Sequence, residues 1–250
     1  MLSFSKRFVE RSLRRLGYEI RKLPGGTTSD SSYGGVHPTS DYTPWSSDQR
    51  FRDVFSAIAS HTLVDEYRCY ELWQLVAEAS KLPAGDLIEI GVWRGGTGGL
   101  IAARCAELAL NSQVYLCDTF KGVVKAGGGD GVYGGGEHSD TSIPIVSDLM
   151  RKLMVSNATI LEGIFPDATS HLISQQAFRF CHIDVDVYQS AKDCMEWLWP
   201  RLLPGGIIVY DDYGFQRCEG VTRCVNEQRG CSDRTIIHNL NGHAVVIKTS

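Results

Sequence analysis

The sequence predicts an α/β fold in which a mostly parallel, seven-stranded β-sheet is covered by helices and finishes in a C-terminal β-hairpin. Two observations support this prediction. From Asp86 onward, short apolar runs rich in Val, Ile and Leu alternate with segments of helical length, which is the rhythm of βαβ units. The last two runs flank Asn241-Gly242, a dipeptide typical of the turn between two antiparallel strands.

The expected elements follow in chain order. Helical patterns cover about 49–60 and 65–81, and Pro83-Ala84-Gly85 then interrupts the chain. The expected strands are 87–91, 114–118, 158–163, 178–184 and 206–212, followed by the hairpin strands 234–240 and 243–249. Because 250 residues with 43% apolar side chains can bury one substantial core, we expect a single domain over 49–250 behind an appendage of residues 1–48.

The appendage has two parts of different composition. Residues 1–23 contain seven Lys or Arg against two Glu, with apolar side chains near helical spacing at Phe4, Phe8, Leu13, Leu16 and Ile20. This pattern predicts a basic amphipathic helix, which would contact an anionic membrane surface, dock on a partner or remain a solvated extension. Residues 24–48 are rich in Gly, Ser, Thr and Pro and are predicted to be a flexible linker.

Composition excludes several classes of protein. The net charge of -4 argues against bulk nucleic-acid binding, which needs a basic patch on the folded domain. The eight cysteines include no pair with CxxC spacing, and several lie in apolar runs, so we expect reduced cysteines buried in the core. With no signal-peptide core and no apolar run near the ~20 residues of a membrane span, we expect a cytoplasmic protein, with peripheral contact at the inner membrane surface through residues 1–23 as an option.

Three carboxylates follow two consecutive expected strands. Asp184 ends one strand, and Asp211 and Asp212 end the next, with the length of one crossover helix between them. Because the carboxyl ends of parallel strands meet at one edge of the sheet, we expect these side chains to converge. Each acid alone is also typical of a helix cap or a surface turn. Together they predict a Mg²⁺ site, since Mg²⁺ prefers hard oxygen ligands and leaves positions for substrate oxygen.

The first strand-to-helix turn predicts a second binding site. Its glycines, Gly91, Gly95 and Gly96, do not fit the GxGxxG spacing that binds a dinucleotide, which argues against a nicotinamide or flavin oxidoreductase. Glu89 supplies an anion suited to an amino or sulfonium group. Asp118 ends the next strand, where an acid commonly accepts hydrogen bonds from ribose hydroxyls. The combination predicts an adenosyl ligand.

A glycine-rich segment follows Asp118. Residues 127–136 contain seven glycines, and glycine raises the entropic cost of ordering a chain. We expect a mobile loop over the carboxyl ends of the strands. The sequence leaves open whether this loop is a substrate lid or a flexible insertion.

Five motifs resemble the macrocin O-methyltransferase family over roughly residues 60–250: GVWRGGT (91–97), DTFKG (118–122), GIFPD (163–167), HIDVDVYQS (182–190) and LLPGGIIVYDDYG (202–214). The resemblance implies a Rossmann-like class I methyltransferase fold, a homo-oligomer, and Mg²⁺-dependent methyl transfer from S-adenosylmethionine to a sugar hydroxyl. It implies metal ligands at Asp184, Asp211 and Asp212. It implies cofactor contacts at Glu89, Gly91, Val92, Gly95, Thr97, Asp118 and Thr119.

The acceptor and the catalytic base stay open at this stage. The acceptor expected from the resemblance is a sugar in a natural product, glycolipid or surface polysaccharide. Asp184 and His182 are the candidate catalytic residues, and the further histidines considered as bases are His138, His238 and His243. We expect Asp186 to support the metal site or to cap the following helix. The alternatives are a metal-independent methyltransferase in which Asp184 is the base, and a non-catalytic scaffold.

Overall fold

The computed structural model describes residues 33, 36 and 40–250, so the helix predicted over residues 1–23 lies outside the described residues. A compact unit spans residues 41–250. This unit begins earlier than the predicted boundary at residue 49, and it includes a short 3-10 helix, η1 (Pro44–Ser46). Within the described part of the chain, no helix is both long enough and apolar enough to cross a membrane.

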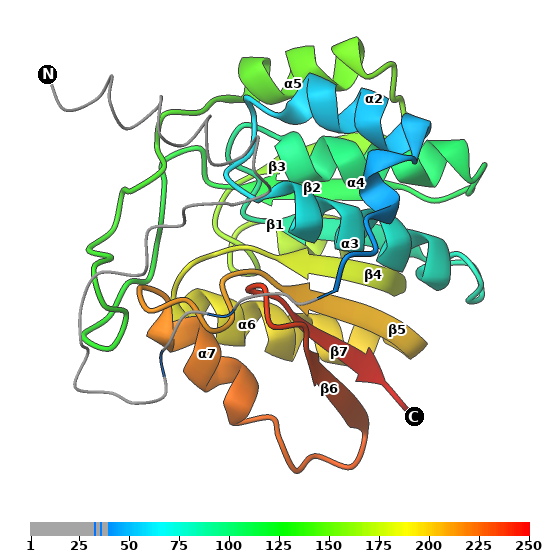
Figure 1. The fold of residues 1–250 in the computed structure, drawn as a ribbon. Helices are drawn as coiled ribbons and strands as arrows, with labels where there is room; N and C mark the ends of the chain where they lie inside the picture. The colour runs from blue at the N-terminus through cyan, green and yellow to red at the C-terminus, as the bar shows by residue number, and fades with distance from the viewer. Residues whose placement is uncertain (1–32, 34–35, 37–39) are drawn as a thin grey trace, which may run out of the picture. The chain divides into compact units, whose positions relative to one another are not determined.

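The described residues form the predicted seven-stranded sheet (Figure 1). Its strands are β1 (Asp86–Ile90), β2 (Val114–Asp118), β3 (Ala158–Glu162), β4 (Phe178–Ile183), β5 (Leu202–Tyr210), β6 (Arg234–His238) and β7 (Ala244–Lys248). The spatial order is β3-β2-β1-β4-β5-β7-β6. The first five strands are parallel, and β7 runs antiparallel to both β5 and β6. The predicted parallel sheet with a C-terminal hairpin is confirmed.

Helices cover both faces of the sheet. Four lie on one face: α2 (Gln49–Ile58), α3 (Glu66–Ala79), α4 (Gly96–Glu107) and α5 (Ile143–Lys152). The other face carries α6 (Tyr188–Leu198) and α7 (Glu219–Asn226). The described residues also form two further short 3-10 helices, η2 (Ser170–Ile173) and η3 (Trp199–Arg201). In Figure 1 the strands follow one another from β3 near the top to β6 near the bottom, with α2 and α5 at the top and α6 and α7 in the lower half. The two helical patterns predicted over 49–60 and 65–81 are α2 and α3.

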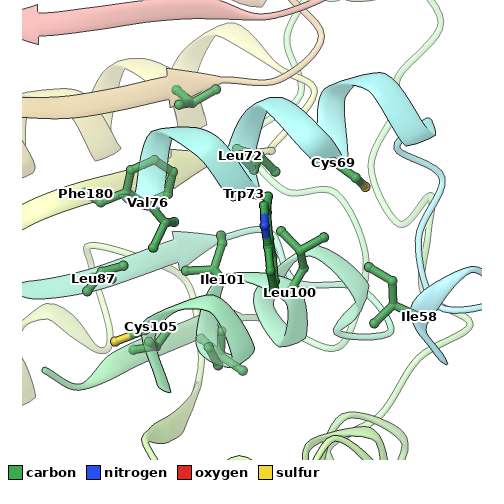
Figure 2. Close-up of a cluster of buried hydrophobic side chains, with 14 of the residues drawn as sticks. Ile58, Cys69, Leu72, Trp73, Val76, Leu87, Leu100, Ile101, Cys105 and Phe180 are labelled. Carbon is green, nitrogen blue, oxygen red and sulfur yellow. The ribbon is translucent and has the colours of Figure 1, made fainter. Parts of the chain in front are cut away.

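Two hydrophobic cores result, one on each face of the sheet. Successive residues of a strand point to opposite faces, so Leu87 packs in the first core and Ile88 in the second. Figure 2 shows the first core, where Trp73 and Leu72 of α3 meet Leu100 of α4. This double burial explains why the parallel strands are near-continuous apolar runs.

The hairpin loop differs in detail from its prediction. The turn between β6 and β7 spans residues 239–243 instead of two residues at Asn241-Gly242, and the Asn239 amide donates to the His243 carbonyl at 3.2 Å. Gly242 has a φ of +99° and packs against Phe215, whose ring would lie 2.2 Å from an added Cβ. A longer loop leaves room for this contact. All eight cysteines are unpaired and seven are buried, as predicted.

Candidate active site

A cavity of about 250 Å³ opens at the carboxyl ends of the parallel strands. Its lining includes eight of the predicted site residues: Gly91, Val92, Thr97, Asp118, Thr119, Asp184, Asp211 and Asp212. Glu89, Gly95 and His182 are absent from the lining. The topology therefore brings together most of the predicted cofactor residues and all three predicted metal ligands.

The three predicted metal ligands meet in space. One carboxylate oxygen from each of Asp184, Asp211 and Asp212 lies within 4.8 Å of the others. Backbone hydrogen bonds continue the sheet beyond the strand ends, from the Asp184 amide to Ile90 and from the Asp211 amide to Ile183, each at 2.9 Å. The two acid-bearing turns are thus fixed by the sheet itself.

Crowding changes the protonation of these acids. Burial, together with the neighbouring carboxylates, raises the pKa of Asp184 well above its usual range, and the same two causes raise the pKa of Asp212. A cation among the three acids would stabilise their charged forms and remove this repulsion. The donor set consists of hard oxygen atoms, so it fits a divalent cation such as Mg²⁺.

Asp211 has protein partners that the sequence analysis missed. Arg68 Nη1 lies 2.6 Å from Asp211 Oδ2, and His243 Nε2 lies 2.7 Å from Asp211 Oδ1. Burial opposes ionisation of Asp211, but the bond from His243 and the charge of Arg68 outweigh it and lower the pKa to about 2. Burial likewise opposes protonation of His243, yet its bonds to Asp211 and Glu71 raise the pKa of this histidine to about 9. Asp211 is therefore the member of the trio whose ionised form these partners stabilise.

Replacing Arg68 with Met should destabilise the protein by about 3 kcal/mol, because it leaves the buried Asp211 carboxylate without its guanidinium partner. Urea denaturation in EDTA would measure the loss. The control is Arg151→Met, whose ion pair with Asp148 is mostly solvent-exposed and should contribute less than about 1 kcal/mol. Equal losses in the two variants would contradict the argument.

Asp186 belongs to the cavity wall. Tyr133 donates its hydroxyl to Asp186 Oδ1 at 2.6 Å, and both residues line the cavity. Asp186 does not cap the next helix, because α6 has Val187 as its N-cap residue and no side-chain cap bond. The capping prediction is wrong, and Asp186 lines the cavity instead.

Glu89 and His182 form a buried pair behind the site. His182 Nδ1 lies 2.8 Å from Glu89 Oε1, and both side chains are fully buried. The two residues are register neighbours on β1 and β4. Neither side chain lines the cavity, so the structure places both behind the residues that do. The cofactor contact of Glu89 and the catalytic role of His182 stay predictions.

Asp118 holds the glycine turn. Its Oδ2 accepts hydrogen bonds from the amides of Val92 (2.7 Å) and Trp93 (2.8 Å), and its Oδ1 accepts one from Phe120 (2.6 Å). A carboxylate has about four acceptor positions, so one remains for a ligand hydroxyl. Asp118 thus shapes the turn and still lines the cavity.

Two glycines of the turn differ in role. Gly91 has a φ of +86°, and a Cβ there would lie 1.6 Å from the Asp184 carbonyl oxygen. The glycine turn that contains Gly91 and the turn that carries Asp184 are therefore in direct backbone contact. Gly95 lies outside the cavity lining: it is the N-cap of α4 in the left-handed conformation, packed against Val146.

The chain is similar to known O-methyltransferases. Residues 39–247 match the macrocin O-methyltransferase family. An enzyme of Streptomyces olivaceus, 8-demethyl-8-(2,3-dimethoxy-alpha-L-rhamnosyl)-tetracenomycin-C 4'-O-methyltransferase, is 30% identical over 186 residues, which cover 70% of each chain. Mycinamicin III 3''-O-methyltransferase of Micromonospora griseorubida is 28% identical over 71% of this chain and 74% of the relative.

Solved structures give the same result. The O-methyltransferase NovP superposes with a TM-score of 0.64 at 25% identity over 76% of this chain and 83% of NovP. The calicheamicin methyltransferase CalS11 superposes with a TM-score of 0.63 at 17% identity over 90% and 98% of the two chains, which confirms the predicted methyltransferase fold. Because the family match covers most of the sequence and the relatives are O-methyltransferases, the chain belongs to the macrocin O-methyltransferase family and is an O-methyltransferase.

Proposed function

We propose that this enzyme moves a methyl group from S-adenosylmethionine to a sugar hydroxyl with the help of Mg²⁺. The observation that carries the proposal is the convergence of Asp184, Asp211 and Asp212 beside the glycine turn at Gly91. The name of the Streptomyces olivaceus relative, which includes a rhamnosyl group, supports a sugar of a natural product as the acceptor. A glycolipid or polysaccharide sugar has the same hydroxyl chemistry.

The residues that would hold the cofactor are those of the turn that line the cavity: Gly91, Val92, Thr97, Asp118 and Thr119. Their chemistry fits an adenosyl ligand, since Gly91 allows close approach to the backbone and Asp118 retains an acceptor position for a ribose hydroxyl. When bound, S-adenosylmethionine supplies an electrophilic methyl group on a sulfonium centre. Because Gly91 contacts the Asp184 backbone, a ligand held by this turn would lie next to the acids.

The acid trio would hold Mg²⁺, which lowers the pKa of a bound hydroxyl and orients its oxygen. The chain must also take up the proton that the hydroxyl loses. We assign this role to Asp186, a cavity-lining carboxylate outside the trio. Asp186 is hydrogen-bonded to Tyr133 and lies beside Asp212, and burial raises its pKa, which suits a carboxylate that accepts a proton. His182, one of the histidines considered as a base from the sequence, is fully buried and does not line the cavity.

Calorimetric titration tests the proposal directly. We expect the protein to bind S-adenosylhomocysteine, to bind Mg²⁺ in a second titration, and to methylate rhamnosyl glycosides only when Mg²⁺ is present. Methyl transfer that survives exhaustive EDTA treatment would favour a metal-independent enzyme. Cofactor binding without transfer to any glycoside or glycan extract would favour a scaffold.

Three earlier expectations remain predictions. Membrane contact concerns residues 1–23, outside the described residues. Homo-oligomer formation and a cytoplasmic location also await measurement. Vesicle flotation of the full chain and of a chain lacking residues 1–23, with sedimentation analysis of both, would test the first two.

A further inference from the structure

The glycine-rich segment contains one buried carboxylate. Asp130 lies among the seven glycines of 127–136, yet it is only 2% exposed. Its Oδ2 accepts a hydrogen bond from the Gly127 amide, and its Oδ1 accepts one from the Tyr188 amide, both at 2.7 Å. The second bond joins this loop to the first residue of α6.

Asp130 replaces a cap that α6 lacks. The first amides of a helix have no partner within the helix and need an acceptor from elsewhere. The N-cap residue of α6 is Val187, whose side chain has no acceptor. Asp130 supplies the missing oxygen from a loop 58 residues away.

Gly220 makes room for this arrangement. A Cβ at Gly220, in the first turn of α7, would lie 2.0 Å from Asp130 Oδ1 and 2.8 Å from the Tyr188 amide nitrogen. Only a residue without a side chain lets the carboxylate enter the space between α6 and α7. The contact therefore depends on residues from three separate segments.

The N-terminus of α6, which Asp130 caps, directly follows the acids of the candidate active site. Asp186 lies two residues before α6, and Asp184 two residues earlier still. Tyr133, three residues after Asp130, donates to Asp186 Oδ1 at 2.6 Å. The segment from Asp130 to Tyr133 therefore holds the acid-bearing turn at two points, the Tyr188 amide and the Asp186 carboxylate.

An independent anchor keeps the loop in place. Lys125 Nζ lies 2.6 Å from Asp193 and 2.8 Å from Asp167, and Ser190 donates its hydroxyl to the Val124 carbonyl at 2.9 Å. These contacts do not involve Asp130. Loss of the Asp130 carboxylate should consequently act on the turn before α6 without detaching the whole loop.

We propose that Asp130 is a positioning residue for methyl transfer: by capping α6 from the glycine-rich loop, it fixes the turn that presents Asp184 and Asp186 to the cavity. The inference rests on the proposed function. It gives the glycine-rich loop a structural role, which is to hold the turn that bears Asp184 and Asp186 in place, and not a role in substrate recognition.

The test compares Asp130→Ala, Asp130→Asn and the control Gly128→Ala in the full-length protein. An added Cβ at Gly128 meets nothing within 4 Å. For Asp130→Ala we expect kcat and Mg²⁺ affinity to fall by about 10- to 100-fold, as for other residues that orient metal ligands, with the KM for S-adenosylmethionine unchanged. Asp130→Asn should recover part of the loss, because its amide oxygen still accepts from the Tyr188 amide while its NH2 group cannot accept from the Gly127 amide. Gly128→Ala should behave as wild type.

Gly220→Ala provides a second route that leaves Asp130 intact. Alanine normally favours a helix over glycine, but here its Cβ would displace the carboxylate, so we expect the defects of Asp130→Ala. Wild-type kcat and Mg²⁺ affinity in both Asp130→Ala and Gly220→Ala would overturn the inference. Parallel loss of S-adenosylhomocysteine binding and thermal stability in both would overturn it too, since that result indicates general destabilisation. If the wild type neither binds Mg²⁺ nor transfers methyl groups, the proposed function fails first, and the inference with it.

Discussion

Replacing Asp184 with Asn is expected to remove Mg²⁺ binding and to lower kcat/KM by about 1000-fold or more, since the metal site loses a charged ligand and with it several kcal/mol of transition-state stabilisation. Affinity for S-adenosylhomocysteine should stay unchanged, because the side chain of Asp184 belongs to the acid trio and only its backbone touches the glycine turn. The measurements are calorimetric titration with each ligand and steady-state kinetics. Separate effects on the two ligands would identify two subsites in one cavity.

The stability of this variant gives an additional check. The pKa of Asp184 is raised by burial and by its acidic neighbours, so in the absence of metal a neutral amide should relieve repulsion. We therefore expect Asp184→Asn to be at least as stable as the wild type in EDTA and less stable than the wild type in excess Mg²⁺. The control is Asp148→Asn on the exposed face of α5, which should match the wild type in every assay. Retained Mg²⁺ affinity in Asp184→Asn would refute the metal site.

Gly91→Ala is expected to cost about 4 kcal/mol or to prevent folding, because a left-handed φ and a steric overlap act together. The φ of +86° is strained for alanine, and the added Cβ would lie 1.6 Å from the Asp184 carbonyl oxygen and 2.6 Å from its carbonyl carbon. Both neighbours are backbone atoms held in the sheet, so they have little freedom to move. If the variant folds, the glycine turn must shift away from the acids, and affinity for S-adenosylhomocysteine should fall as well.

Gly230→Ala separates the two causes. Gly230 has a similar φ of +97°, but an added Cβ there meets nothing within 4 Å. This variant should lose only the conformational cost of about 1–2 kcal/mol. Urea denaturation of both variants gives the comparison. Equal losses would mean that backbone conformation alone explains the requirement for glycine at position 91.

Local sequence signals predicted the bounds of β2 correctly and missed the start of β5. The run 114–118 is β2 with the predicted bounds. The strand β5 begins at Leu202, earlier than the predicted start at 206. Between these two starts lies Pro204-Gly205, a dipeptide that is typical of a turn. In the structure these residues lie within the strand, at a shift in register between β4 and β5, and Gly205 adopts a φ of +80°. A glycine that marks an irregularity inside a strand gives the same local signal as one that ends a strand.

The position of the Glu89 side chain follows from a different sequence signal. Glu89 alternates with Ile88 and Ile90, which belong to the core under α6 and α7, so its side chain points to the opposite face, toward α4. There its Oε2 would lie 2.5 Å from a Cβ at Gly98, and its Oε1 contacts His182. Alternation along the strand is the sequence signal for this placement. The cofactor contact of Glu89 stays a prediction.

The sequence by itself determined the order of strands and helices along the chain and the meeting of Asp184, Asp211 and Asp212 at one sheet edge, because parallel topology places successive strand ends together. The tertiary structure alone decided how each acid is neutralised and which acids face the cavity. Arg68 and His243, the partners of Asp211, come from α3 and the hairpin loop, and Tyr133 reaches Asp186 from the glycine-rich loop. The physical reason is that charge interactions depend on distances in space between segments far apart in the chain, and no local pattern encodes those distances.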